Sequence, residues 1–268
     1  MNRKELIRTR RSVRTFDKTK LRPEDLDELC AYIETIQNPY GIPVRFMILD
    51  AEESGLSTPV TSGESYYIAA LVDKVPHAEE AFGYSFESMV LYAWSLGIGT
   101  TWIAGTMKRE LFEQAAGAEE QERMYCMSPL GYPAAKMSLK ELAMRKGIRA
   151  DKRKPASELF FEKDGSPLKA EREDVKDALE AVRLAPSAVN GQPWRIIHDG
   201  NDYHFYVKHK RGYEENSFGD LQKVDLGIAL NHFMSFVKAD LILEDPQIEC
   251  GSDTEYVGTV RLENTEEE

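Results

Sequence analysis

The second half of the sequence repeats the element order of the first half. A segment with helical spacing of apolar residues (23–36) precedes a turn and a short apolar run (44–49), and the same order recurs at 171–184 and 194–198. Apolar side chains three or four residues apart predict a helix, and short apolar runs bounded by Gly and Pro predict a strand. The chain is therefore expected to contain two related helix–turn–strand copies.

The turns between helix and strand also match in position. The Gly-x-Pro sequence at residues 41–43 stands 150 residues before a second Gly-x-Pro at residues 191–193. With only two copies, the match predicts a duplication and not an extended solenoid. A coincidental match is the alternative, because helix–turn–strand units recur in unrelated α/β proteins. We expect two halves, residues 1–155 and residues 156–268.

Other patterns complete each half. In the first half, residues 66–72 and 123–128 have the apolar character of strands, and residues 82–96 predict an apolar helix. In the second half, residues 203–208 alternate after a short turn and predict a hairpin, and residues 225–238 predict a helix. These patterns together favour a mixed α+β protein.

Composition argues against several classes of protein. The 268 residues carry a net charge of −12, which repels nucleic acid. No apolar run of the sequence is long enough to span a membrane, and the N-terminus lacks the apolar core of a secretion signal. A cytoplasmic location is therefore expected. The three cysteines and five histidines have no metal-ligand spacing, so we expect no metal site.

Three arginines lie close together near the N-terminus. Arg10, Arg11 and Arg14 flank Ser12, and their charges repel one another unless solvent or an anion neutralises them. Planar guanidinium groups suit a phosphate or a polarised carbonyl, and serine adds a small donor. A solvated helix end is the alternative, because cations are favourable near a helix C-terminus.

Two further polar stretches have no obvious role in a core. Residues 149–155 are basic in an acidic protein and lie between the halves, where a linker extended by its charge is the alternative. The stretch APSAVNGQPW, residues 185–194, combines turn-forming residues with Ser187, Asn190 and Gln192. An ordinary turn with Asn or Gly at positive φ is the alternative for this stretch.

The three stretches together resemble those of the FMN-dependent nitroreductase family, and more closely its TM-type branch, in which one chain carries two related halves. The resemblance implies an α+β nitroreductase-like fold. It also implies a covalent pseudo-dimer in place of the family's usual homodimer. The first half would carry the Arg-Arg-Ser loop and a basic arm, and the second half would carry the loop that a partner subunit normally lends. Either a monomeric pseudo-dimer or a homodimer is compatible with this arrangement.

The resemblance further implies a binding site for FMN. Arg10, with Lys152 or Arg153, would contact the phosphate, while Arg11 and Ser12 would face the ribityl chain and the pyrimidine edge. The Pro-Ser-Ala-Val-Asn loop would pack and hydrogen-bond from the other side. The candidate cofactor-binding residues are Arg10, Arg11, Ser12, Arg14, Ala104, Gly105, Lys152, Arg153, Pro186, Ser187, Asn190 and Gln192.

Only one complete site is expected in each chain. The first-half equivalent of the loop, residues 36–44, lacks the Ser, Asn, Gln and Trp of the second-half loop at the matched positions. The second half has no Arg-Arg-Ser sequence before its first helix. We therefore predict one FMN per chain.

The stretch GIGTTWIAG, residues 97–105, has a Trp where a dinucleotide-binding motif requires its third glycine. The resemblance instead implies that a backbone N–H of Ala104 or Gly105 lies against flavin N5, with glycine allowing close approach. The family commonly has an acidic residue at the position of Ala104. A backbone contact would survive this difference, whereas a side-chain contribution to substrate placement would not.

The function implied by the resemblance is that of a flavoprotein oxidoreductase. Hydride would pass from NAD(P)H to FMN and then to a nitroaromatic, a quinone or a similar electron-poor acceptor. No side chain is required as a nucleophile or a general base, because the flavin carries the reaction. Two alternatives are an FMN-binding module without this activity and a flavin-free pseudoenzyme used for protein binding.

Overall fold

Residues 1–210 and 219–263 are described by a computed structural model. They divide into two units. Unit 1 comprises Met1–Ala78 and Ser85–Ala150, and unit 2 comprises Glu79–Tyr84 and the chain from Asp151 onward. The basic segment 152–154 therefore lies in unit 2. A division into halves at residue 155 stays a prediction.

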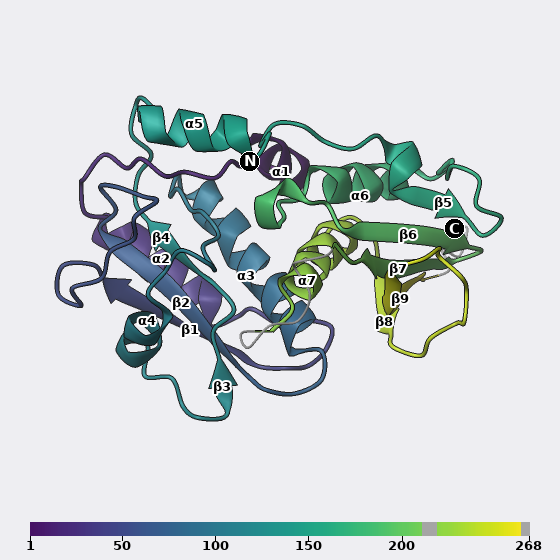
Figure 1. The fold of residues 1–268 in the computed structure, drawn as a ribbon, viewed down its shortest axis with the longest axis horizontal. Helices are drawn as coiled ribbons and strands as arrows, with labels where there is room; N and C mark the ends of the chain where they lie inside the picture. The colour runs from purple at the N-terminus through teal and green to yellow at the C-terminus, as the bar shows by residue number, and fades with distance from the viewer. Residues whose placement is uncertain (211–218, 264–268) are drawn as a thin grey trace. The chain divides into compact units, whose positions relative to one another are not determined.

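Unit 1 is built around a four-stranded antiparallel sheet (Figure 1). The central strand β2 pairs with β1 on one side and with both β3 and β4 on the other. The strands are β1 (Val44–Asp50), β2 (Tyr66–Asp73), β3 (Glu122–Arg123) and β4 (Met127–Leu130). The helices of this unit are α1 (Arg3–Thr9), α2 (Pro23–Ile33), α4 (Arg109–Ala115) and α5 (Leu139–Gly147), with most of α3 (Ala78–Ser95).

The predicted strands 44–49 and 66–72 are confirmed, whereas the single strand predicted at 123–128 is wrong. Residues between β3 and β4 leave the sheet, because the Arg109 guanidinium donates to the carbonyl oxygens of Met124 and Tyr125. These carbonyls therefore have a side-chain partner and do not need a neighbouring strand. A sequence pattern of apolar residues cannot reveal this distant donor.

Unit 2 contains a five-stranded sheet in the order β5-β6-β7-β9-β8. Its strands are β5 (Phe160–Glu162), β6 (Trp194–Asp199), β7 (Asp202–Lys208), β8 (Ala239–Ile242) and β9 (Thr254–Leu262). The hairpin predicted from the alternating pattern is confirmed, since β6 and β7 pair antiparallel around Gly200, which has a φ of 66°. The helices are α6 (Glu173–Leu184) and α7 (Leu221–Met234), with short 3-10 turns at Ala156–Glu158 (η1) and Ala188–Asn190 (η2).

Helix α7 begins four residues before the predicted start at residue 225. The Asp220 side chain accepts hydrogen bonds from the backbone N–H groups of Gln222 and Lys223 and so caps the helix. Aspartate is among the most favourable residues at this position. The predicted end at residue 238 is also too late, because the helix ends at Met234.

The two units contain the same succession of elements. The order helix, antiparallel strand pair, helix describes α2-β1-β2-α3 and again α6-β6-β7-α7. The repeat seen in the sequence therefore extends to a second strand and a second helix in each copy. A coincidental recurrence of one helix–turn–strand unit would explain the first helix and strand of each copy. It would not explain the second strand and the second helix.

Within unit 2, residues 79–84 of α3 pack against α7 through two glycines. A Cβ atom on Gly83 would meet the carbonyl oxygen of Val224, and a Cβ atom on Gly227 would meet the carbonyl oxygen of Glu80. The contact is reciprocal, as in an interface related by a two-fold axis. The Asn231 Nδ2 also donates to the Tyr84 carbonyl oxygen over 3.0 Å. Only glycine permits this approach of two helix backbones.

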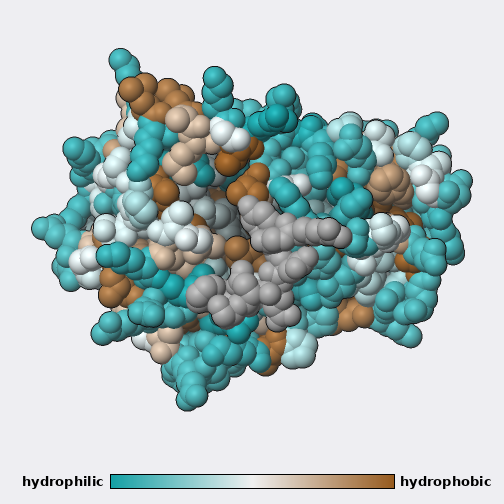
Figure 2. Space-filling model, viewed as in Figure 1, coloured by the Kyte–Doolittle hydropathy of each residue, from teal (hydrophilic) through white to brown (hydrophobic). Residues whose placement is uncertain are grey.

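Polar residues dominate the face shown in Figure 2, with hydrophobic residues in scattered patches. One such patch lies over α5, where Leu139 and Leu142 are exposed. Among the described residues, no helix has the length and apolar character needed to cross a membrane.

Replacing Gly83 by alanine is expected to lower the free energy of unfolding by about 2 kcal/mol or more, the range of an overpacked core position. Backbone atoms of α7 stand where the new methyl group would lie, and they cannot rotate away as a side chain can. Urea unfolding measures the effect. Gly147→Ala is the matched control, because a Cβ at Gly147 meets no atom within 4 Å. Equal stability of the two variants would contradict the close helix contact.

Candidate functional site

The arginine-rich segment 10–16 lies extended in unit 1 beside residues 99–101. Ser12 forms a β-bridge with Thr100, and the Val13 N–H donates to the Thr100 carbonyl oxygen over 2.8 Å. Gly99 makes this packing possible, since a Cβ there would lie 2.9 Å from Val13 Cβ and Cγ2. The absence of a side chain at Gly99 therefore allows the arginine segment to pack against residues 99–101.

Two buried glutamates face the arginines from different helices. Glu87 of α3 lies 3.7 Å from Arg10 Nε, and Glu141 of α5 places Oε1 at 3.6 Å from Arg11 Nη1. These are ion-pair distances but too long for hydrogen bonds. Burial lowers the pKa of Arg14, and the charge of Glu141 opposes that shift. Two carboxylates thus face three guanidinium groups, which leaves an excess of positive charge.

Several donors in this cluster lack an acceptor. Among the described residues, the buried atoms Arg10 Nε, Arg11 Nη1 and Arg14 Nη1 make no hydrogen bond. An unsatisfied buried donor costs free energy, more so when it is charged. The alternative of a merely solvated helix end does not hold for this segment, because α1 ends at Thr9 and the three donor atoms are buried.

Helix α5 fixes the position of the Glu141 carboxylate. Ser138 caps the helix by accepting from the Glu141 N–H over 3.1 Å. Thr15 then donates its hydroxyl hydrogen to Glu141 Oε2 over 2.8 Å, and the Thr15 hydroxyl accepts from the Ser138 N–H. The end of the arginine segment and the start of α5 are thereby held together by hydrogen bonds.

Ala104 and Gly105 lie in a turn after the bridge at Ile103. Ala104 is half-buried and Gly105 is exposed. A Cβ at Gly105 would meet no protein atom within 4 Å, so no described part of the chain requires glycine at this position. Any need for glycine there would come from a bound molecule.

In unit 2, the loop 186–193 has an unusual backbone. Val189, Asn190 and Gln192 all have positive φ, at 45°, 58° and 51°. Asparagine adopts this region readily, but a β-branched valine there is a genuine outlier. Val189 is also exposed. Strain of this kind concentrates at ligand sites and is tolerated where the surroundings fix the loop.

The polar side chains of this loop bind the basic segment 152–154. Gln192 Oε1 accepts from the Lys154 N–H over 2.8 Å, and Asn190 Nδ2 donates to the Lys152 carbonyl oxygen over 2.9 Å. Arg153 Nη1 donates to Asn190 Oδ1 over 3.2 Å. The basic segment 152–154 is therefore docked on the loop, and the alternative of a charge-extended linker does not hold for these residues.

The remaining two loop residues have structural surroundings. Ser187 Oγ accepts from the Gln192 N–H over 2.9 Å, which closes the loop on itself. Pro186 is half-buried just before this closure. The three polar side chains of this loop that were expected to contact a cofactor thus already hydrogen-bond within the unit.

Replacing Gln192 by alanine is expected to release the basic segment, because the variant loses the acceptor for the Lys154 N–H. Trypsin should then cleave after Lys152 and Arg153 several-fold faster, since local opening controls proteolysis. Mass spectrometry of timed digests identifies the cut. Gln121→Ala in unit 1 serves as the control, because Gln121 hydrogen-bonds to the exposed Glu119. An unchanged rate after residues 152 and 153 would show that other contacts hold the segment.

A buried carboxylate anchors the loop from beneath. Both Asp225 oxygens accept from the Ala188 N–H, at 3.0 and 3.1 Å. Burial raises the pKa of Asp225 well above its ordinary value, the Ala188 N–H opposes this shift, and Asp220 adds to it. Helix α7, which carries Asp225, thereby determines where the strained loop lies.

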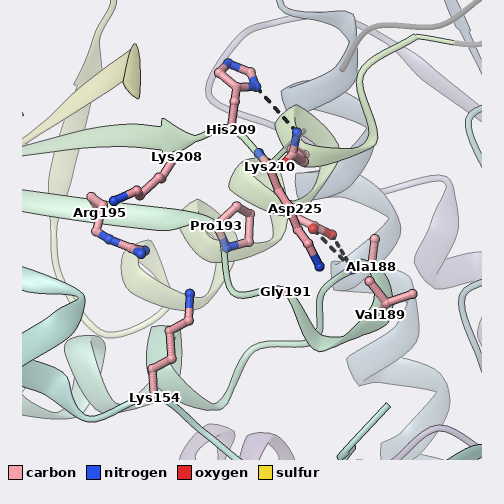
Figure 3. A pocket seen from close by; sticks show the side chains of 11 residues that line it. Lys154, Ala188, Val189, Gly191, Pro193, Arg195, Lys208, His209, Lys210 and Asp225 are labelled. Atoms are coloured by element: carbon pink, nitrogen blue, oxygen red, sulfur yellow. Dashed lines mark hydrogen bonds between the residues drawn. The ribbon is translucent and has the colours of Figure 1, made fainter. Parts of the chain in front are cut away.

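A cavity of about 230 Å³ lies beside this loop, entirely in unit 2 (Figure 3). Of its basic side chains, only Lys154 lies in a stretch that the sequence singles out, residues 149–155, and none was predicted as a binding residue. A usable signal was present, because residues 208–211 read Lys-His-Lys-Arg in an acidic protein. The lining residues with charged or titratable side chains are Lys154, Arg195, Lys208, His209, Lys210 and Asp225.

The stability of the chain should depend on pH through Asp225. A carboxyl group with a raised folded-state pKa binds its proton more tightly in the folded chain, so ionisation opposes folding. The stabilisation is complete below the ordinary value of 3.8 and is lost as the pH rises toward the folded-state pKa. Asp225→Asn keeps a carbonyl acceptor for Ala188 but cannot ionise.

Urea unfolding at about pH 5 and about pH 8 tests this linkage. The variant is expected to gain stability relative to the wild-type chain at the higher pH. Asp220 titrates in both chains and largely cancels in the comparison. Parallel pH profiles of the two chains would contradict ionisation of a buried Asp225.

The candidate residues thus form two groups, each described within its own unit. Unit 1 brings the arginine segment together with Glu87 and Glu141, and unit 2 brings segment 152–154 together with the loop 186–193. Ala104 and Gly105 belong to unit 1.

Comparison with known proteins relates the chain to nitroreductases. Residues 2–236 match the family described as "Putative TM nitroreductase". A crystal structure described as a putative nitroreductase from Thermotoga maritima MSB8 is 21% identical, with 98% of this chain and 94% of that chain covered and a TM-score of 0.60. This likeness shows a nitroreductase-like fold.

Two shorter structures are also similar. A nitroreductase family protein from Clostridium difficile 630 is 18% identical over 59% of this chain and 96% of its own, with a TM-score of 0.47. An FMN-dependent nitroreductase from C. difficile R20291 is 16% identical over 53% and 94%, with a TM-score of 0.42. No curated protein matches the chain. Since the family match spans residues 2–236, the chain belongs to this nitroreductase family.

Proposed function

We propose that the chain is an FMN-dependent oxidoreductase that uses NAD(P)H to reduce a nitroaromatic, a quinone or a similar electron-poor acceptor. Membership of a nitroreductase family supports an oxidoreductase activity in general. The observation that favours a bound anionic cofactor is the set of buried guanidinium atoms without acceptors in segment 10–14. A cytoplasmic location is part of the same proposal.

The donors of unit 1 fit the chemistry of FMN. Its phosphate is close to dianionic at neutral pH, and arginine binds phosphate oxygens through a planar fork. We assign Arg10 to the phosphate, with Arg14 adding positive charge nearby. Arg11 and Ser12 are assigned to the ribityl chain and the pyrimidine edge, where a cation or donor stabilises negative charge.

The basic segment of unit 2 offers matching donors. Lys152 is exposed, and Arg153 is held in place by Asn190 and by the Leu184 carbonyl oxygen at 3.1 Å. Fixed cations bind an anion at lower entropic cost than mobile ones do. We therefore assign Lys152 and Arg153 to the FMN phosphate as well, with Pro186, Ser187, Asn190 and Gln192 shaping the loop that receives the cofactor.

When bound, FMN supplies the hydride chemistry between NAD(P)H and the acceptor. The residues of the chain then bind, orient and stabilise charge. Backbone N–H groups at Ala104 and Gly105 make no hydrogen bond among the described residues. They are free to donate to a cofactor atom, and the open space at Gly105 allows a close approach.

The loop sequence favours one FMN per chain. Residues 36–44 correspond to the second-half loop, and Asn38 in this segment donates to the Ile42 carbonyl oxygen and to Ser85. These hydrogen bonds hold residues 38–42 together through contacts within unit 1, whereas the second-half loop hydrogen-bonds to the basic segment 152–154. We propose that a pseudo-dimeric chain has kept one of two ancestral sites.

Titration of the purified chain with FMN, followed by visible absorption and flavin fluorescence, tests the proposal. The expected ratio is one FMN per chain. Arg11→Ala should weaken FMN binding by at least about tenfold, the scale of a charge-assisted hydrogen bond. Arg22→Ala is the matched control, because Arg22 is an exposed arginine of the same unit that pairs with Asp25. Gly105→Ala should weaken FMN binding without changing stability.

The outcomes separate the alternatives. Bound FMN without oxidation of NADH or NADPH by any acceptor would indicate a flavin-binding module. A colourless chain that ignores added FMN would indicate a pseudoenzyme. A ratio near two would contradict the loss of the second site.

A further inference from the structure

We propose that the basic cavity of unit 2 is a binding site for a phosphate monoester. This cavity is lined by Lys154, Arg195 and Lys208 and by Ala188, Val189, Gly191 and Pro193 of the loop. None of these lining residues is assigned above to FMN, although the loop itself is shared with the proposed FMN site. It needs no flavin to form. The inference goes beyond the proposed function, because it gives a ligand to cations that the proposed FMN site does not use.

Three cationic side chains share one end of the cavity. Figure 3 shows the charged ends of Lys154, Arg195 and Lys208 directed toward the same region. Burial lowers the pKa of Lys154, the charges of Arg195 and Lys208 lower it further, and the charge of Glu158 opposes the shift, so Lys154 is close enough to both other cations to be repelled by them. Within the described ranges, none of the three forms an ion pair with a carboxylate. A multiply charged anion would relieve this repulsion.

Two of the three cations are held in position before any ligand binds. Arg195 Nη1 donates to the carbonyl oxygens of Trp194 and Gln192, at 2.6 and 3.3 Å. Lys154 Nζ donates to the same Gln192 carbonyl oxygen over 3.2 Å. Both side chains keep further N–H donors for a ligand, since a guanidinium has five and an ammonium has three. Fixed donors of this kind are typical of a phosphate site.

The loop wall of the cavity also has the character of a ligand site. Val189 lines the cavity, is 47% exposed and has a φ of 45°. A strained and exposed apolar residue gains burial when a ligand covers it. Asp225 holds this wall through Ala188, and its raised pKa reduces the negative charge near the cavity.

The volume of the cavity and the charge of its lining indicate the chemical class of the ligand. A cavity of about 230 Å³ accommodates a compact head group. Three cations exceed the need of a single carboxylate, whereas a phosphate monoester carries nearly two negative charges at neutral pH. A nucleic acid is disfavoured by the net charge of −12.

Two soluble sources could present this group, if the proposed function holds. FMN carries a phosphate monoester that riboflavin lacks, and NADPH carries one that NADH lacks. Comparing the affinity for FMN with that for riboflavin, and the KM for NADPH with that for NADH, therefore identifies which molecule supplies the phosphate. The site itself is testable without either cofactor.

Isothermal titration of the purified chain with inorganic phosphate is the first experiment. Lys208→Ala should weaken phosphate binding by about tenfold, and Arg195→Gln by at least as much. Lys208 is exposed at the end of β7, so its replacement should leave the fold intact, as thermal unfolding would verify. Lys169→Ala is the matched control, because Lys169 is an exposed lysine of the same unit outside the cavity.

The same variants then identify the source. A loss of affinity for FMN but not for riboflavin assigns the cavity to the flavin phosphate and adds its cations to Arg10, Lys152 and Arg153. A higher KM for NADPH with an unchanged KM for NADH assigns it to the nicotinamide co-substrate. The proposal is overturned if inorganic phosphate does not bind, or if Lys208→Ala and Lys169→Ala bind it equally well. If the chain binds inorganic phosphate but does not bind FMN, the phosphate site is supported and the proposed FMN-dependent function is contradicted.

Discussion

The contact between two helix backbones at Gly83 and Gly227 constrains much of unit 2. Helix α7 can approach residues 79–84 only because neither position has a side chain. Asp225 lies two residues before Gly227 and accepts a hydrogen bond from the Ala188 N–H. This bond fixes the position of the strained loop relative to α7. A displacement of α7 would therefore move the loop, and with it one wall of the basic cavity. The glycines act on the candidate site through backbone position and not through any contact with a ligand.

Unit 1 positions its charges by a different constraint. The arginine segment 10–16 has no regular structure of its own beyond isolated β-bridges at Ser12, Thr15 and Phe16, and Gly99 provides the space for Val13. Two buried carboxylates from separate helices then hold part of the arginine charge at ion-pair distance. Because the distances exceed those of hydrogen bonds, the guanidinium groups retain donors. An arrangement that neutralised these groups fully would leave nothing to bind an anion.

The sequence could predict those structural features whose causes lie within a few residues of one another along the chain. The strands at 66–72 and 194–198 were predictable, because apolar runs and a Gly turn act over a few residues. The break between β3 and β4 was not, because Arg109 lies more than ten residues away in the chain. The docking of Lys154 on Gln192 joins positions 38 residues apart. The sequence pointed to both polar stretches as candidate site segments but could not pair them.

The pairing changes what the polar loop residues imply. Ser187, Asn190 and Gln192 have the composition of a ligand-binding loop, yet their hydrogen bonds hold the loop and the basic segment together. The Asn190 side chain holds Arg153 and the Gln192 side chain holds the Lys154 backbone, and these cations are the groups suited to phosphate. The positive φ of Val189 is tolerated for the same reason, since bonds on both sides of it hold the loop. The polar atoms of a loop motif beside a proposed anion site can therefore serve to place the cations and need not contact the anion themselves.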